Sequence, residues 1–224
     1  MISIIVPVYN EESTISDCLK RLESLDGIKE ILVCDGGSVD KTVEIASRYT
    51  RVLNTPKGRA FQMNAGANAA GGSALWFVHS DSIPDSRSIA AIEEAMQNGY
   101  DAGCFSLYFH DYTDISLKLI AKTSNLRAKY LNLMFGDQGI FMSRDAFLKI
   151  GGYDEIPLME DWNMSKALYR DFKVKVLKER IGTSGRRFKQ KGVFKTLVFM
   201  HRLKLKYITG TSPEELAKMY REVR

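Results

Sequence analysis

Short apolar runs alternate with segments of helical periodicity through the first hundred residues. The β-branched run Ile2–Val8 precedes a segment in which Ile15, Leu19 and Leu22 recur at helical spacing, which predicts a strand and then a helix over 12–25. The same alternation occurs three more times, with strands at 30–34, 51–54 and 74–79 and helices at about 40–49, 59–70 and 86–97. Four such units predict an α/β fold with a mostly parallel central sheet flanked by helices.

The second half of the chain is patterned less regularly. Strands are predicted at 102–108, 139–142 and 173–177, and helices at 114–133, 144–149 and 160–169. Gly151 and Gly152 predict the end of the 144–149 helix. Because no linker or repeat interrupts the pattern, we interpret 1–191 as one domain with halves at 1–100 and 101–191, followed by a basic amphipathic helical tail at 192–224.

Each of the first four predicted strands ends in a polar loop, at 9–12, 35–38, 55–58 and 80–82. Ligands of open α/β sheets bind beyond the carboxyl ends of the strands, so these loops predict the binding edge. They lack the G-x-G-x-x-G and G-x-x-x-x-G-K-[ST] motifs that bind phosphate directly, and the first loop is acidic. A diphosphate there would need a divalent cation, which prefers carboxylate oxygens. Asp81 is the candidate ligand, with His79 either a second ligand or a buried structural group.

The composition is that of an ordinary globular protein, with 45% hydrophobic and 26% charged residues among 224. Three widely spaced cysteines in apolar stretches predict buried free thiols and a reducing, cytoplasmic location. No basic segment precedes the N-terminal apolar run, and no stretch approaches the roughly 20 apolar residues that span a bilayer. We therefore expect neither a signal peptide nor a membrane-spanning helix.

Positive charge is concentrated toward the C-terminus. The net charge is +5, but the segment from Lys173 onward holds 15 Lys and Arg against 4 Asp and Glu. This asymmetry favours an anionic partner such as a diphosphate or a lipid headgroup, with a solvated basic face as the alternative. We expect the amphipathic stretch Val193–Ile208 either to lie on an anionic inner-membrane surface or to pack on the domain. No nucleic-acid partner is expected, because no recognisable module or interleaved aromatic pattern is present.

Six short motifs, in order along most of the chain, resemble those of family 2 glycosyltransferases of the GT-A fold. The matching segments are Pro7-Val8-Tyr9-Asn10-Glu11-Glu12, Asp35-Gly36-Gly37-Ser38-Val39-Asp40, His79-Ser80-Asp81, Gly136-Asp137-Gln138, Met159-Glu160-Asp161 and Arg186-Arg187-Phe188. More narrowly, the chain resembles a short, soluble subgroup that lacks transmembrane helices and ends in a basic helical tail. Two positions depart from the pattern: His79 replaces the first Asp of D-x-D, and Phe188 stands where a Trp is usual.

The resemblance implies a Rossmann-like nucleotide-binding half at 1–100 and an acceptor half at 101–191. It implies inverting transfer of a sugar from a nucleoside-diphosphate sugar, with UDP favoured, to a hydroxyl acceptor that the tail would hold at a lipid surface. A divalent metal, Mn²⁺ or Mg²⁺, would be held by Asp81 and His79 and would neutralise the leaving diphosphate. Asp161 would be the general base, with a helix N-terminal carboxylate as its alternative role.

Loop positions and the resemblance assign the other site residues. Those expected to bind the nucleotide sugar are Pro7, Tyr9, Glu11, Asp35, Lys57, Arg59, Ser80, Asp81 and Arg187. Those expected to bind the acceptor are Asp137, Gln138, Glu160 and Phe188. Asp35 has a turn role as its alternative, because two glycines follow it. Two other functions stay open: a nucleotide-sugar-binding protein without turnover, which His79 favours, and a nucleotidyltransferase, which the acidic first loop disfavours.

Overall fold

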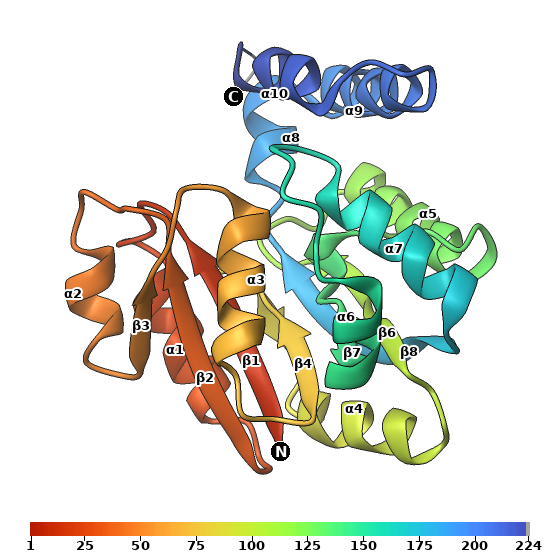
Figure 1. Cartoon of the computed structure of the whole chain (residues 1–224). Helices are drawn as coiled ribbons and strands as arrows, with labels where there is room; N and C mark the ends of the chain where they lie inside the picture. The colour runs from red at the N-terminus through yellow and green to blue at the C-terminus, as the bar shows by residue number, and fades with distance from the viewer. Residues whose placement is uncertain (223–224) are drawn as a thin grey trace.

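The computed structural model describes residues 1–222, and within them eight strands form one sheet with helices on both faces (Figure 1). The last two residues of the predicted tail, 223–224, lie outside the described residues. The first half contains β1 (Ile2–Val8), α1 (Ile15–Glu23), β2 (Lys29–Asp35), α2 (Thr42–Ala46), β3 (Arg51–Asn54), α3 (Arg59–Ala69), β4 (Ala74–Phe77), β5 (Ile83–Pro84) and α4 (Ser88–Gln97). The second half contains β6 (Ala102–Phe109), α5 (Ile115–Tyr130), the 3₁₀ helix η1 (Gly136–Gln138), β7 (Phe141–Ser143), α6 (Arg144–Ile150), α7 (Glu160–Asp171), β8 (Val174–Thr183), α8 (Arg186–Lys191), α9 (Val193–Ile208) and α10 (Pro213–Glu222).

The strand order in this sheet is β3-β2-β1-β4-β7-β6-β8-β5. The pairs β3/β2, β2/β1, β1/β4 and β6/β8 are parallel. Strand β7 is antiparallel to both of its neighbours, and β5 is antiparallel to β8. The carboxyl ends of β1 to β4 therefore meet at one edge of the sheet, as the strand–helix alternation predicted.

Strand β1 alternates between two hydrophobic layers. Its even-numbered residues from 2 to 8 belong to the layer that includes α1 and α4, whereas Ile5 belongs to the layer that includes α3. Helix α3 approaches the sheet closely at Gly66, where a Cβ would lie 2.5 Å from Ile5 Cγ2 and 2.7 Å from Cys34 Sγ. This close packing fixes α3, which begins at the binding edge, over the strands that form that edge.

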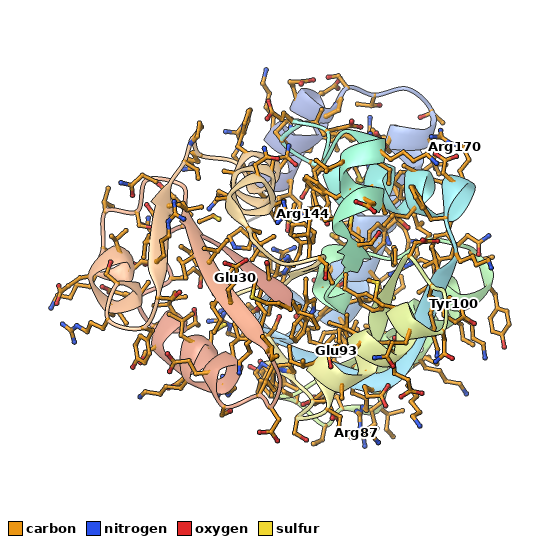
Figure 2. The ribbon with its side chains drawn as sticks, turned by 60° about the horizontal axis from the view of Figure 1, so that its bottom comes forward. Glu30, Arg87, Glu93, Tyr100, Arg144 and Arg170 are labelled. Atoms are coloured by element: carbon orange, nitrogen blue, oxygen red, sulfur yellow. The ribbon has the colours of Figure 1, made fainter. Side chains whose placement is uncertain are left out.

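The opposite end of the sheet is held by side-chain bonds to the turn before β4. Figure 2 labels the two residues responsible, Glu30 of β2 and Arg144 of α6. Glu30 Oε1 accepts the Gly72 N–H at 3.1 Å, and Arg144 Nε donates to the Gly72 carbonyl oxygen at 2.9 Å. The turn is thereby tied to both halves of the domain.

Most predicted elements are present, but several of their boundaries differ from the prediction, as two examples show. Helix α2 starts only at Thr42, whose N–H donates to the Asp40 carboxylate at 3.0 Å, and it ends at Ala46. Strand β8 continues to Thr183, because after a bulge its last residues pair with the end of β6. The short elements β5, η1 and α8 were not predicted. All three cysteines are buried free thiols, as predicted.

The predicted tail packs on the domain through one face of α9 and α10. Leu203 and Leu216 are buried against Met159, and Tyr207 Oη donates to Asn163 Oδ1 at 2.6 Å. The opposite face of α9 exposes a second apolar stripe, formed by Phe194, Val198, Leu205 and Ile208. Within residues 1–222, no helix is both long and apolar enough to cross a membrane.

Candidate functional site

The loops after β1 and β2 are joined by reciprocal hydrogen bonds. Asn10 Oδ1 accepts the Val39 N–H at 2.9 Å, and Ser38 Oγ accepts the Asn10 N–H at 2.8 Å. Asn10 has a φ of 55°, a left-handed conformation that Asn tolerates better than most residues. The Glu11 N–H donates to Thr42 Oγ1 at 2.7 Å. The two loops that the sequence assigned to the nucleotide therefore form one connected unit.

Asp35 lies at the end of β2 and shapes its own loop. Its Oδ2 accepts the N–H groups of Gly37 and Ser38, both at 2.9 Å, and the residue is buried. This bonding matches the turn role that the sequence left open. Lys57, from the loop after β3, lies over the exposed Tyr9 ring with Nζ 3.7 Å from the ring centroid. A cation and an aromatic face thus stand together beside the loops.

Asp81 follows β4 at the same edge and is half-buried. Burial raises the pKa of the nearby Cys18 thiol to about 12, and the negative charges of Asp81 and Glu11 add to that rise. The two carboxylates therefore both lie near Cys18 of α1, at the edge predicted to bind the nucleotide. Ser80 beside Asp81 is buried, and Pro7 is half-buried within β1.

An ion pair joins α3 to α7 at this edge. Arg59 Nε donates to Glu160 Oε1, and Arg59 Nη2 lies 3.9 Å from Asp161 Oδ2. The exposed fraction of the side chain is 2% for Glu160, 14% for Asp161 and 39% for Arg59. Burial raises the pKa of Glu160 against the pull of Arg59, and Glu160 Oε2 is buried without a hydrogen-bond partner. Arg59, assigned from the sequence to the nucleotide sugar, thus pairs with two residues of the predicted acceptor half.

The Asp161 carboxylate is hydrogen-bonded to η1 rather than to its own helix, α7. Its Oδ2 accepts the Gly136 N–H of η1 at 3.1 Å. The N-cap position of α7 is Met159, which makes no side-chain cap hydrogen bond. Met159 has a φ of 74°, a left-handed conformation that costs a non-glycine residue on the order of 1 kcal/mol. Because its side chain is buried against the tail, α9 and α10 help to stabilise the turn that presents Glu160 and Asp161.

His79 lies against the same glycine. A Cβ on Gly136 would lie 3.1 Å from His79 Nε2 and 3.7 Å from Asp161 Oδ2. Burial and the charge of Arg59 lower the pKa of His79 to about 4, against an opposing effect of Asp161. The imidazole is therefore neutral at pH 7, and His79 joins Asp161 and Arg59 in one cluster.

This burial of His79 predicts a loss of stability in acid. The unfolded chain binds a proton at His79 below about pH 6.5, whereas the folded chain does so only near pH 4, so stability falls as pH decreases through this range. The loss reaches about 3 kcal/mol at pH 4. Urea unfolding at several pH values should show a smaller acid loss for His79→Asn than for the wild type. The exposed His110→Asn serves as the control, and equal slopes for all three proteins would contradict the prediction.

Three charged residues, Asp137, Arg127 and Lys204, lie close together near Asp161. Arg127 and Lys204 were not predicted as site residues. Burial raises the pKa of Asp137, whose Oδ1 is buried without a partner, while Arg127 and Lys204 oppose that rise. Both cations lie over the Phe135 ring, with Arg127 Cζ 4.2 Å and Lys204 Nζ 4.7 Å from its centroid. Burial and the charge of Arg127 lower the pKa of Lys204 to about 8. Helix α9 thus contributes a cation to the site.

Neither cation carried a clear signal in the sequence. Lys204 is one of several lysines in an amphipathic tail, and Arg127 lies within a long helix. The one residue whose position in the sequence could have indicated a nearby cation is Phe135, an aromatic residue directly before the Gly136-Asp137-Gln138 motif. Gln138 itself is fully buried, and its Oε1 accepts from Arg127 Nη2 at 3.2 Å. In this structure Gln138 positions Arg127, and its own contact with an acceptor stays a prediction.

Helix α8 carries the last two predicted residues. Phe188 packs edge-on against Phe109 of β6, with ring centroids 5.5 Å apart. Arg187 lies over the Tyr220 ring of α10, with Cζ 4.8 Å from its centroid. Tyr220 in turn lies near Arg59. These contacts connect α8 to the Arg59 cluster through α10 and leave Phe188 against β6.

The donor groups available to a metal are few. Among the described side chains, those of residues 1–221, no three His, Cys, Asp or Glu lie close enough together to hold a metal ion. The nucleotide edge offers the Asp81 carboxylate, while the His79 imidazole contacts Gly136. This donor set fits a cation that takes its other ligands from diphosphate oxygens and water.

Comparisons with known proteins agree with this architecture. The undecaprenyl-phosphate 4-deoxy-4-formamido-L-arabinose transferase of Edwardsiella ictaluri is 32% identical over 113 residues, which are 45% of this chain and 35% of that protein. The mannosyltransferase PcManGT from Pyrobaculum calidifontis, solved with GDP-Man and Mn²⁺, superposes with a TM-score of 0.69 at 16% identity, covering 95% of this chain and 66% of that one. S. aureus TarS 1–349, solved with UDP-GlcNAc, superposes with a TM-score of 0.67 at 17% identity, covering 82% of this chain and 58% of that one.

These structural similarities establish the GT-A fold, and the family follows from the sequence itself. The chain spans about a third of the length of the curated relative named above. The model of glycosyl transferase family 2 matches residues 3–151, which are more than half of this chain. The chain therefore belongs to glycosyl transferase family 2.

Proposed function

We propose that this chain transfers a sugar, with inversion, from a nucleoside-diphosphate sugar to a hydroxyl acceptor, and that Asp161 is the general base. The observation that carries the proposal is the placement of Asp161. Its carboxylate is fixed by the Gly136 N–H and lies 3.9 Å from Arg59, at the edge where the loops after β1, β2 and β4 meet. A carboxylate that only capped α7 would bond to the N–H groups of its own first turn.

The transfer needs one proton acceptor and one stabilised leaving group. The acceptor oxygen bonds to the anomeric carbon as the bond from that carbon to the diphosphate oxygen breaks, and the hydroxyl proton passes to Asp161. A bound divalent metal would neutralise charge on the departing diphosphate. Asp81 would hold it, and Lys57 and Arg187 supply cations for the phosphate oxygens from two sides.

The division of residues between donor and acceptor follows the sheet edge. Asp35 is the last residue of β2, Glu11 and Asp81 belong to the loops after β1 and β4, and we assign all three to the nucleotide. Asp137 and Lys204 lie beyond Asp161, and we assign them to the acceptor. The buried, unpartnered Asp137 Oδ1 supports this assignment, because a buried oxygen of that kind is most often satisfied by a ligand or by water.

The comparisons suggest the chemistry of both substrates. TarS was solved with UDP-GlcNAc and PcManGT with GDP-Man and Mn²⁺, and we favour a uridine nucleotide for this chain. The name of the Edwardsiella relative specifies an undecaprenyl phosphate, which supports a lipid-linked acceptor. A panel of UDP-, GDP-, ADP- and TDP-sugars, tested for transfer and for slow donor hydrolysis with Mn²⁺ or Mg²⁺, would identify the donor.

The tail gives a reason to place this reaction at a membrane surface. Lys195, Arg202 and Lys206 form a basic row beside the exposed apolar stripe of α9, at 100° per residue. An exposed apolar stripe flanked by Lys and Arg is typical of helices that lie in an anionic membrane interface. We therefore propose peripheral contact with the cytoplasmic face of the inner membrane.

Loss of the metal is expected to weaken nucleotide binding. Calorimetry with UDP and Mn²⁺ should give an affinity that falls about tenfold or more with EDTA or in Asp81→Ala, because diphosphate charge would then lack its counter-ion. The exposed Asp17→Ala is the matched control and should bind as the wild type does. Unchanged affinity with EDTA and in Asp81→Ala would show that metal takes no part in nucleotide binding.

A second candidate function is nucleotide-sugar binding without turnover. It is favoured by His79, which stands where the family motif has a carboxylate and leaves Asp81 as the main metal ligand. The two functions make the same prediction for binding and differ in turnover. Release of free sugar or transfer to any acceptor by the wild type, abolished in Asp161→Asn, would exclude the binding-only function.

A further inference from the structure

A second recess lies between α5 and the β6–β8 edge of the sheet, separate from the loops that bind nucleotide. It is a cleft of about 620 Å³ lined by residues of β6, the loop that follows it, α5 and β8. Figure 1 shows α5 and the paired strands β6 and β8 on the side of the molecule away from β2 and β3. None of the residues assigned to the transfer reaction lines this cleft.

Five cations line the cleft, and no carboxylate does so among the described residues. The cations are Lys118, Lys122, Lys129, Lys178 and Arg180. Within residues 1–222 none of these five forms an ion pair; the ion pairs there involve other residues. Arg180 stacks on Tyr108, with Cζ 4.2 Å from the ring centroid. Uncompensated positive charge of this density around one recess favours an anionic ligand.

The floor of the cleft is apolar. It includes the buried Leu107 and Leu177. The polar side chains at the floor are already bonded to the protein: Ser106 Oγ donates to the Leu177 carbonyl oxygen, and Asn125 bonds to both the N–H and the carbonyl oxygen of Leu107. The floor therefore suits a hydrocarbon segment, while the rim suits a phosphate. A ligand that satisfies both is an amphiphile.

The outer face of α5 also carries a charged stripe beside an apolar stripe. At 100° per residue, its lysines at 118, 122 and 129 form one stripe, and the exposed Ile115, Leu119, Leu126 and Tyr130 form a second stripe directly beside it. The lysine stripe borders the cleft, and Leu126 belongs to both the apolar stripe and the cleft wall. Such a helix can lie in a lipid interface with its lysines among the headgroups.

One end of the cleft reaches the predicted substrate side of the domain. Phe109 and Tyr112 line that end, where Phe109 packs against Phe188 of α8. Lys189 of α8 lies over the Tyr112 ring, with Nζ 5.1 Å from its centroid, and pairs with Asp114 at 2.9 Å. A lipid held in the cleft would therefore be adjacent to α8.

We propose that this cleft binds the phosphate head and first chain segment of an anionic membrane lipid, with the apolar stripe of α5 resting on the membrane that supplies it. The site is additional to the nucleotide edge and does not depend on Asp161 or on metal. It deepens the proposed membrane contact by adding α5 as a second lipid-facing helix, and it stands even if α9 makes no such contact.

The test uses dihexanoyl phosphatidic acid as the probe, below its critical micelle concentration, with the full chain. Saturable binding to the wild type is expected, and it should weaken at least tenfold in the double variant Lys122→Glu/Lys178→Glu. A control of equal charge change, Lys20→Glu/Arg51→Glu, places both substitutions on exposed positions of α1 and β3 and should bind as the wild type does. Melting temperature and UDP binding, measured in parallel, should be unchanged in both variants, which separates this result from failure of the nucleotide site.

Two further measurements distinguish a lipid phosphate from inorganic phosphate as the ligand of the cleft. Inorganic phosphate alone should bind at least tenfold more weakly than the short-chain lipid, and phosphatidic acid vesicles should retain the wild type more strongly than the cleft variant. A third variant, Lys195→Glu/Arg202→Glu/Lys206→Glu on α9, should keep binding the short-chain lipid. Equal affinity for inorganic phosphate, or equal loss in the cleft and control variants, would overturn the lipid site.

Discussion

Replacing Asp161 with Asn is expected to reduce sugar transfer by about 10²- to 10⁴-fold while the protein stays folded and still binds its donor. The amide is nearly isosteric with the carboxylate, and its oxygen can still accept the Gly136 N–H. It cannot accept the acceptor's proton, so only the chemical step is lost. Transfer and melting temperature should be measured on the same preparations.

Asp145→Asn is the matched control for this variant. Asp145 is an exposed acidic residue in the first turn of α6, as Asp161 is an acidic residue in the first turn of α7. Both substitutions change the charge near a helix N-terminus by the same amount, so a capping or dipole effect would appear in both. Near wild-type transfer by Asp161→Asn would remove it as the base and move that role to Glu160 or Asp137.

Replacing Arg59 with Met is expected to destabilise the fold by about 3 kcal/mol at pH 7, because Glu160 would stay buried without its partner. Met keeps the apolar stem of the side chain and removes only the guanidinium. The buried Glu160 carboxylate would then bind a proton more readily. The difference in unfolding free energy between the variant and the wild type should therefore become smaller as pH falls toward 4. Urea unfolding followed by tryptophan fluorescence measures both effects.

The double variant Arg59→Met/Glu160→Gln should recover much of that loss, since the uncompensated charge is gone. The surface pair Arg48–Glu44 offers the control, because it is also an Arg–Glu ion pair but is well exposed, with Glu44 in α2 and Arg48 just after it. Arg48→Met should cost only about 0.5 kcal/mol. Costs of similar size for the two Arg variants would show that burial of Glu160 adds nothing to the strength of the Arg59 pair.

The sequence predicted well which loops share the carboxyl-terminal edge of β1 to β4, because that edge is built from local patterns. Each loop comes directly after a strand whose apolar run can be recognised from its own residues. Locating β2 and β4 therefore places Asp35 and Asp81 at the edge. Helix α2 was overestimated because the Asp40 side chain, rather than helical periodicity, sets its start. The ends of elements are fixed by such single bonds, which periodicity does not report.

The interior of the site was harder to predict because it depends on contacts between distant segments. Arg59 and Glu160 are far apart in sequence, and nothing local to either one indicates that they pair. Lys204 reaches the site because the apolar face of α9 packs around Met159, and a tail described by its charge alone gives no sign of this. For His79 the sequence gives two alternatives, a metal ligand or a buried group, and the structure places it buried beside Gly136, where burial lowers its pKa.

The contribution of α9 to the site has a consequence for the order in which the protein matures. A chain leaves the ribosome N-terminus first, and domains generally fold as units during synthesis, so the domain that ends with β8 can fold before α9 and α10 emerge. Asp161 and the left-handed turn at Met159 emerge before the helix that covers them, so the nascent chain exposes Met159 and Trp162 for a time. The loops after β1 to β4 can therefore be in place while the turn at Met159 is still uncovered, and the proposed transfer would then begin only after the last helices pack.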